Sequence, residues 1–401
     1  MTEFFKHDIR RAAEILREGG LVAVPTETVY GLAGNGLDEN AVQRIYDVKG
    51  RPSLKPLSLM VHDASWMERL CTDVPKAAKT LADAFWPGPL TIILPAKDTI
   101  PAIVRAGGDT IGLRCPDHPD TLELIEAADL PLAAPSANPS GEPSPKTAQQ
   151  VADYFDGAIE AILDGGPCGI GTESTIVDLA HTPYRVLRQG ALPEETVWQC
   201  LRDAVTVIGI TGGTGCGKTT LLEQLQKHDA LILDADAVYH ELLQTDAALL
   251  DEIEARFPGT VENGVLQRKK LGAVVFSDPA ALEDLNRITH RSIQDEIERR
   301  ITDWARMGGT LAAIDAVALI ESGIAETCSV VVGVTAPREQ RIERLISREG
   351  ISRDYAERRI DAQPSDAWYR DHCGHVLEND GTLESFQQQA ELWIQEVLHH
   401  G

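Results

Sequence analysis

The sequence predicts an α/β protein with two domains, and three observations support this class. The chain has 401 residues, and single hydrophobic cores stop growing at about 250–300 residues. Apolar runs of strand length alternate with helical patterns in both halves. Residues 207–220, VIGITGGTGCGKTT, are a strand-like run that breaks into a glycine-rich loop in the middle of the chain. We therefore expect one domain at 1–204 and another at 205–401.

The composition is that of an ordinary soluble globular protein, with 43% hydrophobic and 25% charged residues. The net charge of -25 disfavours strong direct binding to nucleic acid, because neutralising phosphates supplies most non-specific affinity. No stretch approaches about 18 apolar residues and the amino terminus carries no long apolar segment, so we expect no membrane span. These features favour a cytoplasmic enzyme.

In the first half, the amino-terminal MTEFFKHDIRRAAEIL has an amphipathic helix pattern, and we expect the helix at about 7–18, before a stop at two glycines. The run LVAVPTETVYGLAG follows as a buried strand that ends in a polar turn, where Thr26 and Tyr30 cluster. Three cations, Lys49, Arg51 and Lys55, then lie close together just before another apolar strand. They suit a polyphosphate, although a solvated surface loop would look similar in isolation.

Later segments of this half place single polar residues in or beside predicted strands. Arg114 lies in the apolar strand IGLRCP, where an unpaired charge would be costly. Ser136 and Asn138 lie in the Pro/Ser/Gly-rich loop of PLAAPSANPSGEPSPKT. Ser174 and Arg188 lie in GTESTIVDL and RVLRQGAL, which close the domain.

Taken together, these segments closely resemble the threonylcarbamoyl-adenylate synthases, the Sua5/YrdC family, over residues 8–200. PTETVYGL, KGRP with KPL, WPGPLT, SANPSG, G-x-x-ST and R-x-G stand in the order and spacing of that family. The resemblance implies a twisted α/β fold with a concave cleft and an ATP-dependent reaction of L-threonine with bicarbonate. The product would be threonylcarbamoyl-adenylate, which a separate transferase complex uses to modify adenosine in tRNA.

The same resemblance implies roles for the polar residues. Lys49 and Arg51 would clamp the ATP triphosphate and the carbamate, with Lys55 close behind and Mg²⁺ neutralising the leaving pyrophosphate. Thr26 and Tyr30 would line the threonine site. The adenylate and the substrate carboxylate would be held by Arg114, Ser136, Asn138, Ser174 and Arg188.

Two alternatives stay open for this half. The fold type also occurs in a carbamoyl-transfer domain of hydrogenase maturation proteins, usually beside acylphosphatase and zinc-finger-like segments that this sequence does not show. Other relatives were once thought to bind double-stranded RNA, a function that the acidity disfavours.

In the second half, the loop satisfies G-x-x-x-x-G-K-[ST], the phosphate-binding motif that follows a strand and opens a helix. Its glycines let backbone N–H groups converge on phosphate oxygens, and the helix directs its positive end at the same charge. Lys218 would reach the β- and γ-phosphates, and the Thr219 hydroxyl would hold Mg²⁺. The predicted ATP-binding residues of the loop are Gly212, Gly213, Thr214, Gly215, Cys216, Gly217, Lys218, Thr219 and Thr220.

Cys216 has two interpretations. A helix N-terminus could lower the pKa of its thiol, or the residue could simply fill a small position in the loop, which we favour.

Further elements continue the αβ alternation, which predicts a parallel sheet flanked by helices. LILDADAVYHELL (231–243) follows as strand and helix, and Asp234 and Asp236 should face the same side of the strand end. One could be a general base and the other could support Mg²⁺, while helix capping is the competing interpretation. Residues 266–293 read as helical, 310–323 and 328–336 as buried strands, and 338–363 as a helical pair. Arginines 341, 344, 348 and 359 fit a mobile lid over ATP.

This half is similar to dephospho-CoA kinase over residues 206–398. TGGTGCGKT, LDAD, VF-SDP, Q-R-I-E-R-L-x-x-R and R-I-x-x-Q recur in the order of that family. The resemblance implies phosphate transfer from ATP to the 3′-hydroxyl of dephospho-CoA, with Asp236 as base and Arg344 or Arg348 as a lid cation.

The family's usual D-R is Gln267-Arg268 here, its H-P is His290-Arg291, and its P-L-L is Val317-Ala318-Leu319. These departures lie near the presumed acceptor side, so a redirected or inactive small-molecule kinase stays open, as does a non-enzymatic scaffold.

Overall fold

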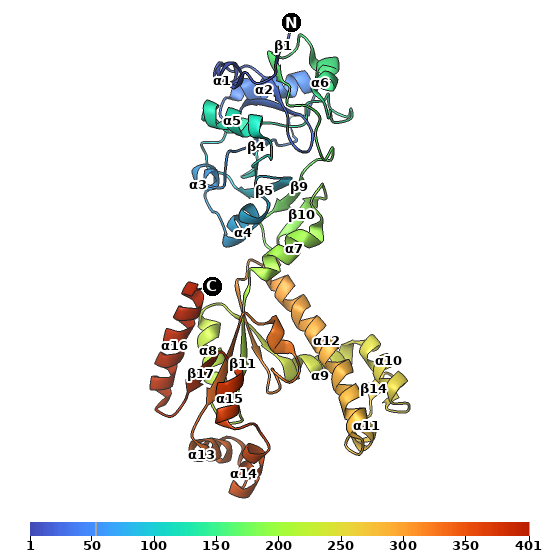
Figure 1. Cartoon of the computed structure of the whole chain (residues 1–401), viewed down its shortest axis with the longest axis vertical. Helices are drawn as coiled ribbons and strands as arrows, with labels where there is room; N and C mark the ends of the chain where they lie inside the picture. Colours follow the sequence, from blue (N-terminus) through green and yellow to red (C-terminus); the bar gives the residue numbers. More distant parts are fainter. Residues whose placement is uncertain (53, 401) are drawn as a thin grey trace. The chain divides into compact units, whose positions relative to one another are not determined.

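The computed structural model describes residues 1–52 and 54–400, which fold into two compact units (Figure 1). Unit 1 comprises Met1–Leu201 together with Arg306–Gly308. Unit 2 comprises Arg202–Ala305 and the chain from Gly309 onward. The first break lies close to the expected boundary after residue 204, and no feature of the sequence indicates that residues 306–308 belong to unit 1.

Ten strands form the sheet of unit 1, with parallel and antiparallel neighbours mixed. Its spatial order is β1 (Glu3–Phe5), β8 (Ala161–Leu163), β2 (Val22–Val24), β3 (Gly31–Asn35), β7 (Leu132–Ala133), β4 (Ser58–Met60), β6 (Thr110–Arg114), β5 (Leu90–Pro95), β9 (Thr175–Asp178) and β10 (Arg185–Arg188). The connections cross over repeatedly, so residues far apart in sequence meet at the same strand ends.

Among the residues that the structure describes, seven helices accompany this sheet: α1 (Ile9–Arg17), α2 (Glu39–Lys49), α3 (Trp66–Leu70), α4 (Lys76–Phe85), α5 (Pro119–Ala128), α6 (Ala148–Phe155) and α7 (Glu194–Asp203). The first begins where Asp8 accepts a hydrogen bond from the Arg11 N–H at 3.0 Å, as an N-cap should. Its apolar face packs with α5 into a core that includes Leu16, Leu124 and Leu163. That core fixes one end of the sheet.

Five parallel strands form the central sheet of unit 2, which confirms the predicted parallel sheet flanked by helices. Their order is β12 (Leu231–Asp234), β15 (Leu311–Asp315), β11 (Thr206–Thr211), β16 (Val330–Thr335) and β17 (His375–Glu378). The chain builds β12 and β15 on one side of β11 and then β16 and β17 on the other. The connections therefore diverge at the carboxyl end of β11, where open parallel sheets bind their ligands.

The remaining elements of unit 2 are α8 (Lys218–Lys227), α9 (Ala235–Thr245), α10 (Ala247–Arg256), the hairpin β13 (Val261–Glu262) and β14 (Val265–Leu266), α11 (Arg268–Val275), α12 (Pro279–Arg306), the 3-10 helix η1 (Ile324–Thr327), α13 (Arg338–Glu349), α14 (Arg353–Asp361), α15 (Asp366–His372) and α16 (Leu383–His400). In Figure 1, α8 and α16 lie together on one side of the sheet and α12 on the other. The α13–α14 pair buries a small cluster of its own, Ile342, Leu345, Ala356 and Ile360.

Four expectations for these elements need correction. The Glu3–Phe5 segment before α1 is the edge strand β1, paired with β8, and not part of the helix. Only Leu311–Asp315 of the predicted strand 310–323 is extended, and the helical stretch 266–293 is broken between α11 and α12. Asp236 lies in the first turn of α9 and not on a strand, because the Asp234 carboxylate accepts the Ala237 N–H at 3.0 Å and starts the helix.

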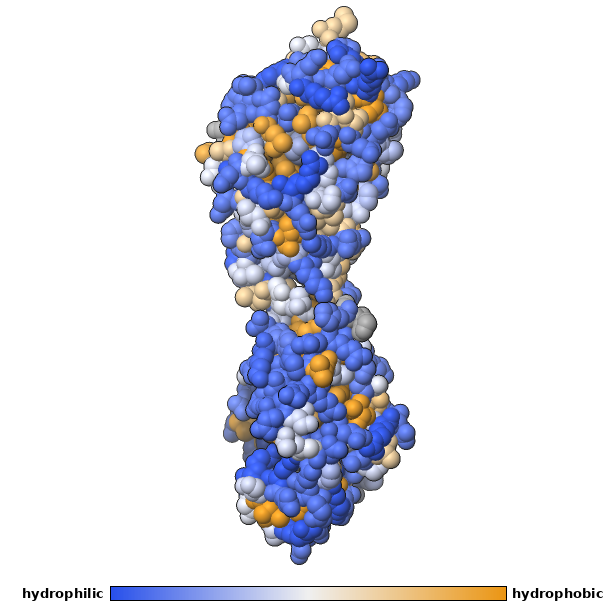
Figure 2. All heavy atoms as spheres, turned by 90° about the vertical axis from the view of Figure 1, so that its left-hand side faces the viewer, coloured by the Kyte–Doolittle hydropathy of each residue, from blue (hydrophilic) through white to orange (hydrophobic). Residues whose placement is uncertain are grey.

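Hydrophilic side chains dominate the face of the molecule in Figure 2, and apolar residues occupy only scattered areas of it. This agrees with the high content of charged residues. Within the part of the chain that the structure describes, no helix combines the length and apolar character needed to cross a bilayer.

Candidate active sites

A pocket in unit 1 collects most of the polar residues that the sequence singles out. It opens between the β2–β3 connection, the segment after α2, strands β4, β5, β6 and β10, and the loops that follow β7 and precede β9. The predicted site residues that line it are Tyr30, Arg51, Arg114, Ser136, Ser174 and Arg188. Thr26, Lys49, Lys55 and Asn138 do not line it.

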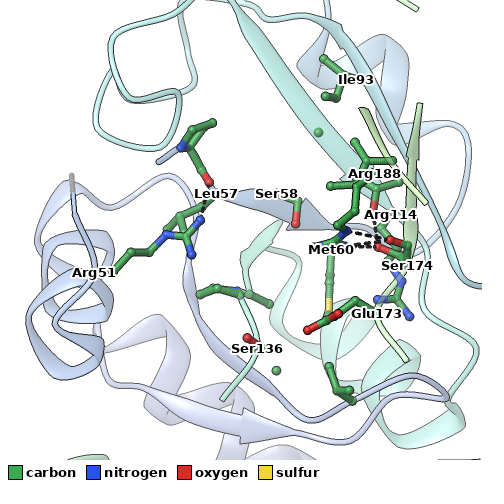
Figure 3. A pocket seen from close by; sticks show the side chains of 18 of the residues that line it. Arg51, Leu57, Ser58, Met60, Ile93, Arg114, Ser136, Glu173, Ser174 and Arg188 are labelled. Carbon is green, nitrogen blue, oxygen red and sulfur yellow. Dashed lines mark hydrogen bonds between the residues drawn. The ribbon is translucent and has the colours of Figure 1, made fainter. Parts of the chain in front are cut away.

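Three guanidinium groups face this pocket. Figure 3 shows Arg51 on one side and Arg114 and Arg188 together on the other. Burial lowers the pKa of Arg188, Glu173 acts in the opposite direction, and the charges of Arg114 and Arg51 lower it further. The arginines are therefore close enough to repel one another, and an anion between them would relieve that repulsion.

The buried Arg114 is paired, as its position in an apolar strand requires. Its Nη2 donates to Glu27 Oε1 at 2.6 Å and to Thr28 Oγ1 at 2.8 Å, and its Nε donates to the Gly88 carbonyl at 3.3 Å. The side chains of Arg114 and Glu27 are only 9% and 11% exposed. This pair holds one guanidinium edge in place and leaves the rest of the group on the pocket wall.

Ser174 and Arg188 form the neighbouring part of that wall (Figure 3). Arg188 donates to the Ser174 carbonyl from Nε at 3.1 Å and from Nη2 at 2.8 Å, and Nη2 also lies 3.2 Å from Ser174 Oγ. The hydroxyls of Ser174 and Thr91 are 2.8 Å apart. Strand β10 and the loop before β9 are thus tied together by the side chains that face the pocket.

Thr26 and Tyr30 have different environments although the sequence places them in one turn. The Thr26 hydroxyl accepts the N–H groups of Thr28 and Val29 at 3.1 and 3.2 Å and donates to the Val29 carbonyl at 2.7 Å. It therefore shapes the turn from within. Tyr30 lines the pocket and donates its hydroxyl to the Gly166 carbonyl at 2.7 Å, and burial raises its pKa.

Lys49 is buried behind the pocket wall. Its Nζ donates to the carbonyls of Ser136 and Asn138, and burial, assisted by the charge of Arg51, lowers its pKa to about 7. The Asn138 amide donates to the Pro139 carbonyl at 3.0 Å. These bonds fix the loop that presents Ser136, while the Lys55 side chain is exposed.

The glycine-rich loop of unit 2 lies between β11 and α8 and forms a second cleft. Gly212, Gly215 and Gly217 have positive φ, which L side chains rarely adopt. A Cβ on Gly212 would lie 2.3 Å from the Val334 carbonyl oxygen. The predicted residues that line the cleft are Gly213, Thr214, Gly215, Gly217, Lys218, Thr219, Arg344 and Arg348, and Gly212, Cys216 and Thr220 lie outside it.

Lys218 begins α8 and faces this cleft. Its Nζ donates to the Gly212 carbonyl at 3.2 Å and lies 3.8 Å from Asp315 Oδ1. Burial raises the pKa of Asp315, the Lys218 charge opposes this, and Asp234 and Asp236 raise it further. The structure therefore brings three carboxylates and one ammonium to the carboxyl ends of β12 and β15, with Asp234 engaged in capping α9.

The four arginines assigned to a lid separate into two groups. Arg344 and Arg348 line the cleft, and Arg344 Nη1 donates to the Gly215 carbonyl at 3.2 Å. Arg341 is instead buried under the loop, and Arg359 pairs with Glu349 away from the cleft lining. Only the first two are placed to reach a phosphate.

Cys216 is fully buried, and burial raises the pKa of its thiol. The loop therefore gives no activated thiolate, in agreement with the interpretation of Cys216 as a small filling residue. Its carbonyl accepts the Asn379 amide at 2.9 Å.

Several residues of both sites are not predicted from the sequence. Glu27 and Glu173 lie inside quoted motifs, but nothing local marks them as partners of Arg114 and Arg188. Asn379 is equally hidden in sequence. Asp315 carried a usable signal, since a carboxylate ends a strand that is otherwise apolar and buried.

Two family models match separate parts of the chain. Residues 14–190 match the Sua5/YciO/YrdC family model, described as telomere recombination, and residues 206–385 match the dephospho-CoA kinase model.

The threonylcarbamoyl-AMP synthase of Pyrococcus abyssi is 51% identical over 189 residues, which are 47% of this chain and 56% of that protein. The chain thus spans little more than half the length of that relative. A putative threonylcarbamoyl-AMP synthase of Methanocaldococcus jannaschii is 36% identical over 200 residues, which are 50% of this chain and 90% of that protein.

Among solved structures, P. abyssi Sua5 complexed with L-threonine aligns at 30% identity over 80% of this chain and 93% of that chain, with a TM-score of 0.49. Through its first unit the chain belongs to the Sua5/YrdC family of threonylcarbamoyl-AMP synthases, and a dephospho-CoA kinase domain of the CoaE family follows.

Proposed function

We propose that unit 1 makes L-threonylcarbamoyl-adenylate from L-threonine, bicarbonate and ATP. The observation that carries this proposal is that three arginines, Arg51, Arg114 and Arg188, line one pocket of a chain whose net charge is -25. ATP, bicarbonate and the threonine carboxylate are all anions, so the surplus of local positive charge matches the whole substrate set. The P. abyssi relative, a named threonylcarbamoyl-AMP synthase, supports the reaction class.

In the proposed reaction, the threonine amine attacks the carbon of bicarbonate, and loss of water leaves a carbamate anion. A carbamate oxygen then attacks the α-phosphorus of ATP, and the bond to pyrophosphate breaks. Positioning and charge neutralisation suffice for both steps, and no protein nucleophile is required.

We assign the substrates to the two sides of the pocket. Arg114, Arg188 and Ser174 hold the adenylate and the threonine carboxylate, and Arg51 meets the triphosphate. Tyr30 borders the threonine side. Lys49 keeps the loop of Ser136 and Asn138 in place, and its Nζ reaches a phosphate only after leaving those carbonyls.

For unit 2 we propose transfer of the γ-phosphate of ATP to the 3′-hydroxyl of dephospho-CoA. The glycine-rich loop cradles the phosphates, Lys218 moves from Asp315 to the γ-phosphate, and Arg344 and Arg348 close from α13. Asp236 is the proposed base for the acceptor hydroxyl. Thr219 and the buried Asp315 Oδ1, which lacks a hydrogen-bond partner in the structure, would hold Mg²⁺, and the ion would neutralise phosphate charge.

The proposed products define the partners. Threonylcarbamoyl-adenylate is an activated donor, so a tRNA-modifying transferase complex in the cytoplasm is the expected consumer. Unit 2 would supply coenzyme A, and no intermediate passes between the two reactions.

Isotope labelling tests the first activity. Purified protein is incubated with Mg-ATP, L-threonine and ¹³C-bicarbonate, and the nucleotide products are analysed by mass spectrometry. We expect a threonylcarbamoyl-adenylate that carries the heavy carbon and disappears when threonine is left out. Carbamoyl transfer without adenylate formation would contradict the proposal and favour the hydrogenase-maturation type of reaction.

The second activity is tested with dephospho-CoA and Mg-ATP, followed by mass spectrometry of the acceptor. We expect coenzyme A and ADP in equal amounts. ADP without phosphorylated acceptor would indicate an uncoupled ATPase. Phosphorylation of another small hydroxyl compound in preference to dephospho-CoA would show that the altered residues on the acceptor side have redirected the kinase.

A further inference from the structure

Two side chains hold both backbone polar groups of one residue in the glycine-rich loop. Gln363 Oε1 accepts the Thr214 N–H at 2.8 Å, and Arg341 Nε donates to the Thr214 carbonyl at 3.0 Å. Arg341 Nη2 also donates to Gln363 Oε1 at 3.0 Å. The three residues therefore close a ring of hydrogen bonds that includes the backbone N–H and carbonyl of Thr214.

The surroundings show that this ring is a built part of the loop. Arg341 is 4% exposed, and the nearest carboxylate, that of Asp366, is 4.0 Å away. A Cβ on Gly213 would lie 2.2 Å from Arg341 Nη2, so glycine at this position makes room for the guanidinium. Neither Arg341 nor Gln363 lines the nucleotide cleft, and both act on it only through the loop.

Gln363 also occupies a junction in the chain. It follows α14, the second helix of the pair that carries Arg344 and Arg348 on its first helix. α13 and α14 pack against each other through their own apolar cluster. Gln363 lies where this helical pair joins α15, so its hydrogen bond connects the end of the pair to the loop.

We infer that Gln363 is a positioning residue that orients the Thr214 peptide and so sets the phosphate-binding loop before nucleotide arrives. The inference rests on the proposed binding of nucleotide by unit 2. Without the Gln363 acceptor, the Thr214 N–H and one Arg341 N–H lose their partner, and the loop must be ordered by the nucleotide itself.

The test compares two nearly isosteric variants of the full chain. Gln363→Met removes the acceptor, whereas Gln363→Glu keeps it and pairs with Arg341. Mg-ADP affinity is measured by calorimetry at a temperature at which each variant is folded. We expect Gln363→Met to bind about 10- to 100-fold more weakly and Gln363→Glu to stay within about fivefold of the unmodified protein. In turnover, Gln363→Met should raise the KM for ATP and not that for the acceptor.

Gln395→Leu, a change at an exposed glutamine on α16, is the control and should bind as the unmodified protein does. If Gln363→Met does not fold, Gln363→Asn tests the same point, because its shorter side chain holds the acceptor back from the loop. Unchanged affinity in Gln363→Met would overturn the inference, as would equal weakening by Gln363→Met and Gln363→Glu. If the unmodified protein bound no nucleotide, the proposed function of unit 2 would fail first.

Discussion

The two clefts meet phosphate in different ways. In unit 1 the positive charge comes from side chains at positions 51, 114 and 188, which the crossed sheet brings to one pocket. In unit 2 a contiguous loop, of which Gly213, Thr214, Gly215, Gly217, Lys218 and Thr219 line the cleft, supplies backbone N–H groups and one lysine, and Arg344 and Arg348 line the cleft beside it. The first kind of site depends on the whole sheet, whereas the second depends on local backbone shape and on the groups that brace it.

The sharpest way to separate the sites is Lys218→Ala. We expect phosphate transfer to the acceptor to fall by about 100- to 1,000-fold, because one charge aimed at the transferred phosphoryl group is removed. Threonylcarbamoyl-adenylate formation should not change. Both products are measured by mass spectrometry in one reaction mixture, and an equal loss of both would mean that the units do not act independently.

Arg114→Met tests the side-chain site. Breaking the buried pair leaves Glu27 charged and unpaired, so the free energy of unfolding should fall by about 3 kcal/mol. Synthase activity should fall at least about tenfold. Urea denaturation and product formation are the two measurements.

The double variant Arg114→Met/Glu27→Gln is the control for this change. It also removes the Glu27 carboxylate that Arg114→Met leaves without its arginine. The free energy of unfolding should therefore return most of the way to that of the unmodified protein, whereas synthase activity should stay low. Recovery of activity as well would show that Arg114 acts only through the fold.

Gly212→Ala tests the backbone site. Its Cβ would meet the Val334 carbonyl oxygen, and φ is 146°, so we expect a loss of about 2 kcal/mol and weaker Mg-ADP binding. Gly264→Ala is a control that separates backbone strain from steric clash, because φ is 73° at Gly264 but no atom lies within 4 Å of the added Cβ. That control should lose about 1 kcal/mol and bind nucleotide normally. Normal binding by Gly212→Ala would show that the loop tolerates reshaping.

The last effect concerns pH and Lys49. Its pKa is lowered to about 7 in the folded protein, whereas the ordinary pKa of a lysine, expected in the unfolded chain, is 10.5. Between these values the unfolded state binds the extra proton, so stability rises with pH in this window, by at most about 1.4 kcal/mol per pH unit. Thermal unfolding from pH 7 to 9 should show a steeper rise for the unmodified protein than for Lys49→Met. Parallel curves would mean that Lys49 stays protonated in the fold.

The same contrast explains what the sequence could predict. The phosphate-binding loop of unit 2 could be predicted from the sequence, because its residues are contiguous and each has a steric or electrostatic role in the motif. The β1 strand was not, since its pairing with β8 depends on residues more than a hundred positions away. Glu27 was missed because a carboxylate beside a turn looks solvated until Arg114 is brought to it.

Asp236 illustrates a local ambiguity with a local cause. Two aspartates at a strand end fit extended backbone and helix start equally well, and the Asp234 cap decides for the helix. Thr26 is similar, because a hydroxyl that shapes a turn has the same sequence signature as one that binds a ligand. Roles that depend on which partner a polar group finds require the fold.

The separate cluster of Ile342, Leu345, Ala356 and Ile360 gives unit 2 an uneven resistance to local unfolding. These few side chains hold α13 against α14, while β11 and β16 belong to the main core. In hydrogen–deuterium exchange, amides of the helical pair should therefore exchange well before those of the central strands. Bound nucleotide should slow amide exchange in these helices and leave exchange in the strands unchanged. Nucleotide binding can therefore be detected in the part of the unit that opens most easily.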